Sequence, residues 1–305
     1  MRLQVIYRDR KGHTRRINFN VTKPAFIKHM GIAGMGYAPR LHKFRRVIGM
    51  FLHYGDYFRD FSKNKFSEPL IQDPTEKGQF SNLVGKAIAD YLSKRINRAF
   101  FTVNYEFAMR ERRIPLRGYR PDLIAFGKNF RFAIEAKGFS KSYVSNIEMN
   151  GYKLQACSGP IPVNFAVASV SYNLYNSVKC KYYDPFIDYR FDEKDEGLLK
   201  KISRQYYSGL KEFLNEKYFE IQTEIYRNEE FYVLTPRYKT LISWGTLRCI
   251  WKCWFIKWSL ILTKKIDKFA KEGITGALAP FEMFEEENVY IDADRIGIKL
   301  LYKLK

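Results

Sequence analysis

Two short apolar segments on either side of a tight turn leave few choices for the local fold near the middle of this chain. Residues 123–126 are apolar, and apolar residues alternate with others over 130–137. This pattern predicts two antiparallel strands joined by a two-residue turn at 128–129. In that register Asp122 stands opposite Glu135, because the positions of opposed residues keep a constant sum.

This hairpin carries a combination of charges that an apolar hairpin does not need. Opposed carboxylates repel each other and destabilise a sheet, so Asp122 and Glu135 have little structural reason to be there. A divalent cation would remove the repulsion, and Mg²⁺ usually takes one or two carboxylates plus substrate phosphate. Lys137 shares the face of Glu135, where it can stabilise phosphate charge or help to deprotonate water. The structural alternative is an edge hairpin with a surface Glu–Lys pair.

The segments around the hairpin predict an α-β-β-β-α-β order. An apolar stripe with helical spacing begins the series, and β-branched and aromatic runs follow it. The expected elements are a helix over 76–97, strands over 100–109, 121–126 and 130–137, a helix over 143–156 and a buried strand over 163–172.

Pro121-Asp122 followed by Glu135-Ala136-Lys137 resembles the PD-(D/E)XK nuclease superfamily, over about residues 76–175. The resemblance implies an α/β fold, a restriction-endonuclease-like mixed central sheet flanked by helices. In that family the aspartate and the second acidic residue bind metal, and the lysine assists attack. The main-chain carbonyl between acid and lysine often binds the metal too. Carried over, the metal ligands are Asp122, Glu135 and the Ala136 carbonyl, and Lys137 is catalytic.

Two further positions match the family more loosely. Many members add an acidic residue on the first helix, where Glu76 stands at the helix start and Asp90 further along. Some add a polar residue on the next helix, here Gln155. The implied activity is Mg²⁺-dependent hydrolysis of DNA, with Mn²⁺ as a substitute and 5′-phosphate products. A type II-like restriction endonuclease fits best; the alternatives are a transposon end-nicking enzyme, a repair or recombination nuclease, or a non-catalytic nucleic-acid-binding subunit.

The distribution of charge predicts a polyanionic partner. The chain has 53 Lys and Arg against 32 Asp and Glu, a net charge of +21. Residues 1–70 hold 15 basic against 4 acidic residues, 71–180 hold 16 against 8, and 181–305 hold 22 against 20. Concentrated positive charge repels itself and suits a polyanion, most simply nucleic acid, although a generally basic surface is the alternative. With the implied nuclease activity, the expected partner is double-stranded DNA. The arginines expected to contact DNA lead into the hairpin and are Arg112, Arg113, Arg117 and Arg120.

The chain divides into three predicted regions. Residues 1–70 form a basic N-terminal region, with a hairpin around the turn at 9–12 and a basic helix over 39–54 that are candidates for DNA contact. Residues 71–180 form the nuclease core. Residues 181–305 form a mixed α+β region, with a hairpin turn near 227–228, suited to sequence recognition or to the contacts of a homodimer.

A Trp-rich apolar segment over 241–262 raises the question of a membrane. Arg248, Lys252 and Lys257 would each be costly at mid-bilayer, so we expect a buried helix or strand pair and no membrane span. A peripheral membrane protein is the remaining alternative of this class. The first residues lack the apolar core of a signal peptide, and we expect an intracellular, cytoplasmic protein.

Other polar residues carry weaker signals. Asp292 and Asp294 share a strand face near Lys299 but lack obvious partners, and we expect them to be exposed. Cys249 and Cys253 are better explained as buried thiols than as metal ligands. All four histidines precede residue 54, so a histidine metal site near the hairpin is not expected.

Overall fold

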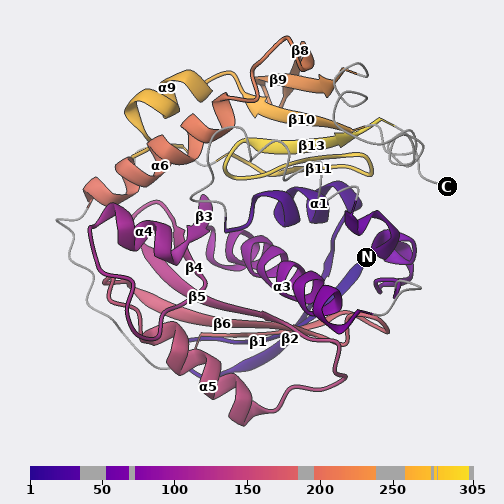
Figure 1. The fold of residues 1–305 in the computed structure, drawn as a ribbon, viewed down its shortest axis with the longest axis vertical. Coiled ribbons are helices and arrows are strands. Elements are labelled where there is room, and N and C mark those ends of the chain that lie inside the picture. The colour runs from indigo at the N-terminus through magenta and orange to yellow at the C-terminus, as the bar shows by residue number, and fades with distance from the viewer. Residues whose placement is uncertain are drawn as a thin grey trace.

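The structure is a computed structural model that describes residues 1–34, 53–68, 73–184, 196–237, 258–275, 278–279 and 281–301. It is a mixed α/β protein with two sheets, and helices lie between and around them (Figure 1). Nearly all of the basic helix predicted over 39–54 falls outside the described residues, as does the Trp-rich segment up to residue 257.

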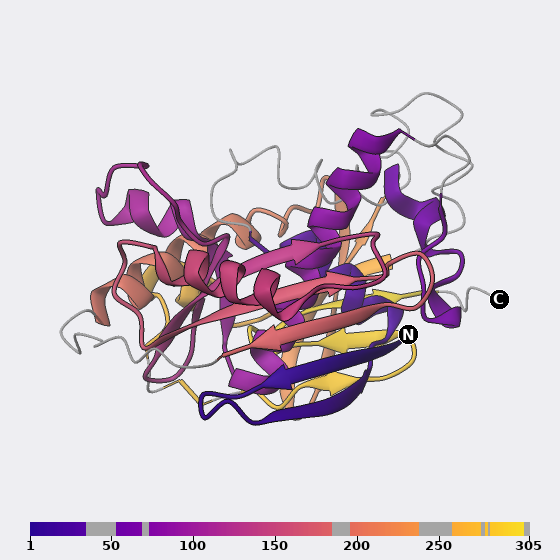
Figure 2. The same ribbon diagram turned by 90° about the horizontal axis from the view of Figure 1, so that it is seen from below.

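The first sheet has seven strands in the order β2-β1-β7-β6-β5-β4-β3. The strands β3, β4 and β5 form an antiparallel meander, and β6 then runs parallel to β5. The predicted N-terminal hairpin is present, and it extends this sheet because β1 pairs in parallel with β7 (Figure 2). Their bounds are β1 (Arg2–Arg8), β2 (Thr14–Asn20), β3 (Phe101–Asn104), β4 (Leu123–Phe126), β5 (Arg131–Gly138), β6 (Phe165–Tyr172) and β7 (Lys179–Tyr183).

Two long helices cover opposite faces of this sheet: α3 (Pro74–Asn97) and α5 (Asn146–Cys157) (Figure 1). The Asp73 side chain begins α3 by accepting a hydrogen bond from the backbone of the first turn. Ser145 and Glu148 form a reciprocal capping box at the start of α5. Both predicted helices are therefore confirmed, and each begins at a residue suited to capping.

The strand predicted over 100–109 is wrong in its second half. The strand β3 ends at Asn104, whose side chain accepts a hydrogen bond from the Phe107 backbone. The helix α4 (Tyr105–Glu111) begins there instead. The aromatic residues of this segment favour a strand by composition, but the Asn104 cap satisfies the backbone of a helical turn and ends the strand.

The second sheet has six strands in the order β11-β12-β13-β10-β9-β8. The predicted hairpin turn is confirmed, with Arg227 and Asn228 at φ 49° and 62° between β8 and β9. The last part of the apolar segment forms β10, which is buried throughout. The bounds are β8 (Phe219–Tyr226), β9 (Glu229–Pro236), β10 (Trp258–Thr263), β11 (Phe284–Glu285), β12 (Val289–Ile291) and β13 (Ile296–Leu300).

Helices connect the two sheets into one body. The helix α1 (Lys23–Ile32) packs against α3 on one side and against β12 and β13 on the other. The helices α6 (Glu196–Lys211) and α9 (Ile266–Glu272) pack on each other beside the second sheet. Short 3₁₀ turns occupy η1 (Gly55–Phe58) and η2 (Phe61–Lys63). Among the described helices, none is both long and apolar enough to cross a membrane.

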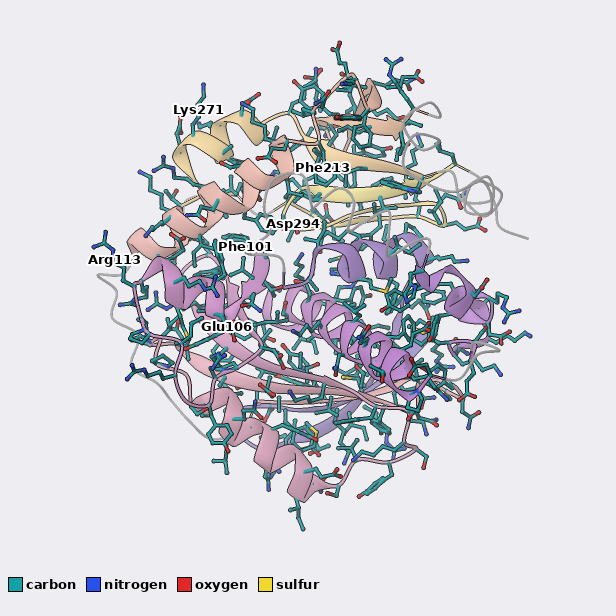
Figure 3. The ribbon with its side chains drawn as sticks, viewed as in Figure 1. Phe101, Glu106, Arg113, Phe213, Lys271 and Asp294 are labelled. Carbon is teal, nitrogen blue, oxygen red and sulfur yellow. The ribbon has the colours of Figure 1, made fainter. Side chains whose placement is uncertain are left out.

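A cluster of buried charges lies where α1 and α3 meet the second sheet. The prediction that Asp292 and Asp294 are exposed is wrong, because both side chains are 0% exposed. Lys28 of α1 lies 2.8 and 2.7 Å from them, and Lys94 of α3 lies 2.7 and 2.9 Å from them. Figure 3 shows Asp294 between the two sheets. Their partners come from about 200 residues away or more, so local sequence could not reveal the burial.

His29 and Asp90 extend this cluster along α3. His29 Nδ1 lies 2.7 Å from Asp90 Oδ2, and Thr102 donates a hydrogen bond of 2.8 Å to Oδ1. Burial lowers the pKa of His29 against the opposing effect of Asp90, so His29 is neutral at pH 7. The cluster therefore joins α1, α3 and β3 to the second sheet. Both carboxylate oxygens of Asp90 have partners within it.

Candidate active site

The register predicted for the central hairpin is confirmed. The strands β4 and β5 pair with Leu123 opposite Ile134, and the turn lies at 128–129. The ladder ends at the Leu123–Ile134 pair, so Asp122 and Glu135 are the next residues in register. The two carboxylates therefore lie at the end of the hairpin, where β4 and β5 separate.

Short contacts bring four residues together at this end of the hairpin: Asp122, Glu135, Ala136 and Lys137. Lys137 Nζ lies 2.5 Å from Glu135 Oε1 and 3.3 Å from Asp122 Oδ2. The Ala136 N–H donates a hydrogen bond of 3.2 Å to the same Asp122 oxygen. The N–H and C=O of one strand residue point to the same side of the strand, so the Ala136 carbonyl also faces the side of Asp122.

The Glu135 carboxylate is fully buried, with Lys137 as its charged neighbour. Its residue is 0% exposed, and in register on β6 stands the buried Ala168. Although Lys137 is close, neither Glu135 oxygen accepts a well-directed hydrogen bond within the described part of the chain. Burial, with the charge of Asp122, raises the pKa of Glu135 to about 7. The charged form is therefore short of stabilisation, an uncommon state for a buried carboxylate.

Lys137 keeps its charge in this setting. Burial lowers its pKa, but the nearby carboxylates of Asp122 and Glu135 outweigh that effect, and the pKa of Lys137 is raised. The side chain is 27% exposed, so its ammonium group is accessible from outside. A charged, partly exposed ammonium beside two carboxylates is suited to binding phosphate oxygens.

The residues present fit a single hard divalent cation. Two carboxylates lie on either side of Lys137, and the Ala136 backbone contacts one of them. The described residues include no cluster of three or more His, Cys, Asp or Glu side chains suited to a metal ion. Two carboxylates would leave coordination positions for water and phosphate, which Mg²⁺ usually keeps.

Within the described part of the chain, Glu76 and Gln155 make no hydrogen bond or ion pair with Asp122, Glu135 or Lys137. Glu76 accepts a hydrogen bond of 3.1 Å from the Tyr57 hydroxyl. Gln155 lies near the end of α5, where its main-chain carbonyl accepts two hydrogen bonds from Ser158.

The structure adds Lys86 of α3, which the sequence did not single out. Lys86 Nζ lies 3.3 Å from Asp122 Oδ1, the oxygen that Lys137 leaves free. The sequence signal was the small residues Ser81 and Gly85, one turn apart on the same helix. A Cβ on Gly85 would lie 2.5 Å from the Lys137 carbonyl carbon, so α3 touches β5 backbone to backbone.

The four arginines predicted to contact DNA differ in their exposure and in their contacts. Arg120 donates to Glu106 from Nε at 2.7 Å, and Arg112 is half-buried at the end of α4. Arg113 and Arg117 are exposed, and no ion pair involves their side chains in the described structure. Figure 3 shows Arg113 at the periphery of the molecule. The Asp122 backbone contacts the first residue of α4, and Arg113 follows the end of that helix, which is about 10 Å long.

Comparison of the chain with protein-family models, with curated proteins and with solved structures gave no match. The class that the structure shows is mixed α/β. Any assignment of function therefore rests on the geometry and chemistry of the site.

The burial of Glu135 should make the stability of the folded protein depend on pH. In metal-free protein, Glu135→Gln should be more stable than the natural chain at pH 8, and the difference should shrink below pH 7 and vanish below about pH 4. The pKa of Glu135 is raised on folding from an ordinary value near 4.5 to about 7, so its stabilising contribution is lost as the pH rises through 7. Thermal melts in EDTA measure the difference, with the exposed Glu272→Gln as control. A difference that does not change with pH would contradict this environment.

Proposed function

We propose that this protein is a Mg²⁺-dependent endonuclease that hydrolyses phosphodiester bonds of double-stranded DNA. The observation that carries the proposal is the meeting of Asp122, Glu135 and Lys137 at the end of the β4–β5 hairpin, with Glu135 fully buried beside Lys137. A structural hairpin has no use for two opposed carboxylates there, whereas a metal-dependent phosphoryl-transfer site does.

The surrounding architecture supports the proposal. The helix α3 precedes the antiparallel meander β3-β4-β5, and α5 then leads to β6, which is parallel to β5. Apart from the short helix α4 between β3 and β4, this order matches the α-β-β-β-α-β order expected of the restriction-endonuclease-like core. Within the proposal, the chain outside that core supplies room for sequence readout, and we place the enzyme with type II-like restriction endonucleases.

Each side chain has a separate task in the proposed reaction. Asp122, Glu135 and the Ala136 carbonyl would hold Mg²⁺, which polarises the phosphate and lowers the pKa of an attacking water. Glu135 is buried and therefore rigid, so it fixes the position of the site. Lys137, which carries its charge at neutral pH, stabilises the negative charge that grows on the phosphate oxygens during in-line attack.

A plasmid assay tests the proposal. Supercoiled DNA incubated with the protein and Mg²⁺ should become nicked or linear, with 5′-phosphate ends, and EDTA should prevent the change. Ca²⁺ should support DNA binding with little cleavage because its looser geometry positions water poorly. Intact plasmid at high protein concentration with either Mg²⁺ or Mn²⁺ would contradict the proposal.

Two exposed arginines should contribute to DNA binding. The double variant Arg113→Ala/Arg117→Ala should bind a short duplex more weakly, and its log–log salt slope should be shallower by about 2, one unit for each lost phosphate contact. The matched control is Lys264→Ala/Lys265→Ala, which also removes two positive charges. In the structure these lysines pair with Glu230 and Glu229. An equal or larger effect in the control pair would place the DNA elsewhere.

A further inference from the structure

The position of Lys86 is fixed by an unusually close contact between a helix and a strand. A Cβ on Gly138 would lie 1.8 Å from the Ser81 carbonyl oxygen, and one on Gly85 would lie 2.7 Å from the Lys137 carbonyl oxygen. No side chain separates α3 from the end of β5 at these points. The residue after Gly85 is therefore held beside the hairpin end, where its ammonium group reaches Asp122.

The two oxygens of Asp122 are shared between two lysines. Lys137 contacts Oδ2 and Lys86 contacts Oδ1, each at 3.3 Å. Lys86 is 30% exposed, so it can leave Asp122 for another anion without opening the core. Two carboxylates and two ammonium groups give the site no net charge when all four are ionised. One divalent cation would raise its charge to +2, which balances the two negative charges of a phosphorane-like transition state, and a second cation would exceed it.

The carboxylates of α3 are engaged elsewhere. Glu76 binds the Tyr57 hydroxyl, and ten residues of helix separate it from Lys86 by about 15 Å. Asp90, one turn beyond Lys86, is buried with His29 and Thr102. The α3 side chain that reaches the site is therefore that of Lys86, a cation. A second metal ion would instead need another carboxylate at this position.

We propose that Lys86 takes the place of a second metal ion, so that the site binds one divalent cation per chain and Lys86 contacts the scissile phosphate. This inference rests on the proposed function and assigns to Lys86 a catalytic role within it. Once Asp122 turns to the cation, the Lys86 ammonium loses its partner and becomes available to a phosphate oxygen. It then stabilises the charge of the transition state on the side opposite to Lys137.

Counting bound Mn²⁺ tests the inference apart from activity. The electron paramagnetic resonance signal of free Mn²⁺, titrated against the protein, should show one ion per chain for the natural sequence and for Lys86→Gln. Lys86→Glu adds a third carboxylate and should bind two. At saturating Mg²⁺, Lys86→Gln should cleave DNA about a hundredfold more slowly. The control is Lys77→Gln, which lies on the same helix but pairs with Glu68, and it should behave like the natural chain.

The outcomes separate this inference from the proposed function. Two ions per chain in an active natural protein, or full cleavage by Lys86→Gln, would overturn the role of Lys86 and leave the nuclease assignment standing. Absence of both Mn²⁺ binding and cleavage in the natural protein would overturn the nuclease assignment, and the role of Lys86 with it.

Discussion

Glu135→Gln is expected to lower the rate of DNA cleavage about a thousandfold or more while leaving DNA binding intact. The substitution keeps the size of the side chain but removes the charge that would hold Mg²⁺, and with it the stabilisation of the transition state. DNA binding depends mainly on phosphate contacts by Lys and Arg, so it should change little. Single-turnover cleavage of a labelled duplex and a binding titration in Ca²⁺ give the two quantities.

The matched control for this variant is Glu272→Gln. Glu272 is exposed at the end of α9, far from the hairpin in sequence, and its substitution removes the same charge. It should leave both cleavage and binding unchanged. Comparable cleavage by Glu135→Gln and the natural protein would show that Glu135 is not a metal ligand.

Lys28→Met is expected to destabilise the protein by about 3–5 kcal/mol. Its ammonium group is 0% exposed and bridges Asp292 and Asp294, so its loss leaves two buried carboxylates with too little positive charge. Methionine retains most of the volume, so a cavity contributes little. Urea denaturation of the natural and variant proteins measures the difference in the free energy of unfolding.

An exposed ion pair provides the comparison for Lys28. Lys264 is 34% exposed and lies 3.3 Å from Glu230, and Lys264→Met should cost less than about 1 kcal/mol. A loss of under 1 kcal/mol for Lys28→Met as well would mean that the cluster is hydrated in solution. The second sheet would then be joined to α1 and α3 less tightly than the structure shows.

The sequence was informative where the interactions are local. The alternation of strand residues and a two-residue turn determine which residues face each other, so the opposition of Asp122 and Glu135 could be predicted without any tertiary information. The helix α3 carries an apolar stripe at helical spacing, and it was predicted for the same reason. Local rules erred at Asn104, where one hydrogen bond to the backbone outweighs strand propensity.

Longer-range features could not be predicted in this way. Lys86 is one of many basic residues, and only the packing of Gly85 against β5 brings it to Asp122. The burial of Asp292 and Asp294 depends on lysines from α1 and α3, about 200 residues or more away. A pattern of charges along one strand contains no information about such partners, and exposure was the natural expectation for both aspartates.

The account depends most on the claim that Asp122 and Glu135 together bind a metal ion. Crystals of the protein with a short duplex and Mn²⁺, measured at a wavelength where manganese scatters anomalously, test it directly. We expect one anomalous peak about 2.0–2.3 Å from carboxylate oxygens of both Asp122 and Glu135, and near the Ala136 carbonyl. Ordered DNA with no peak at this point, or with Mn²⁺ bound only at other residues, would contradict the account.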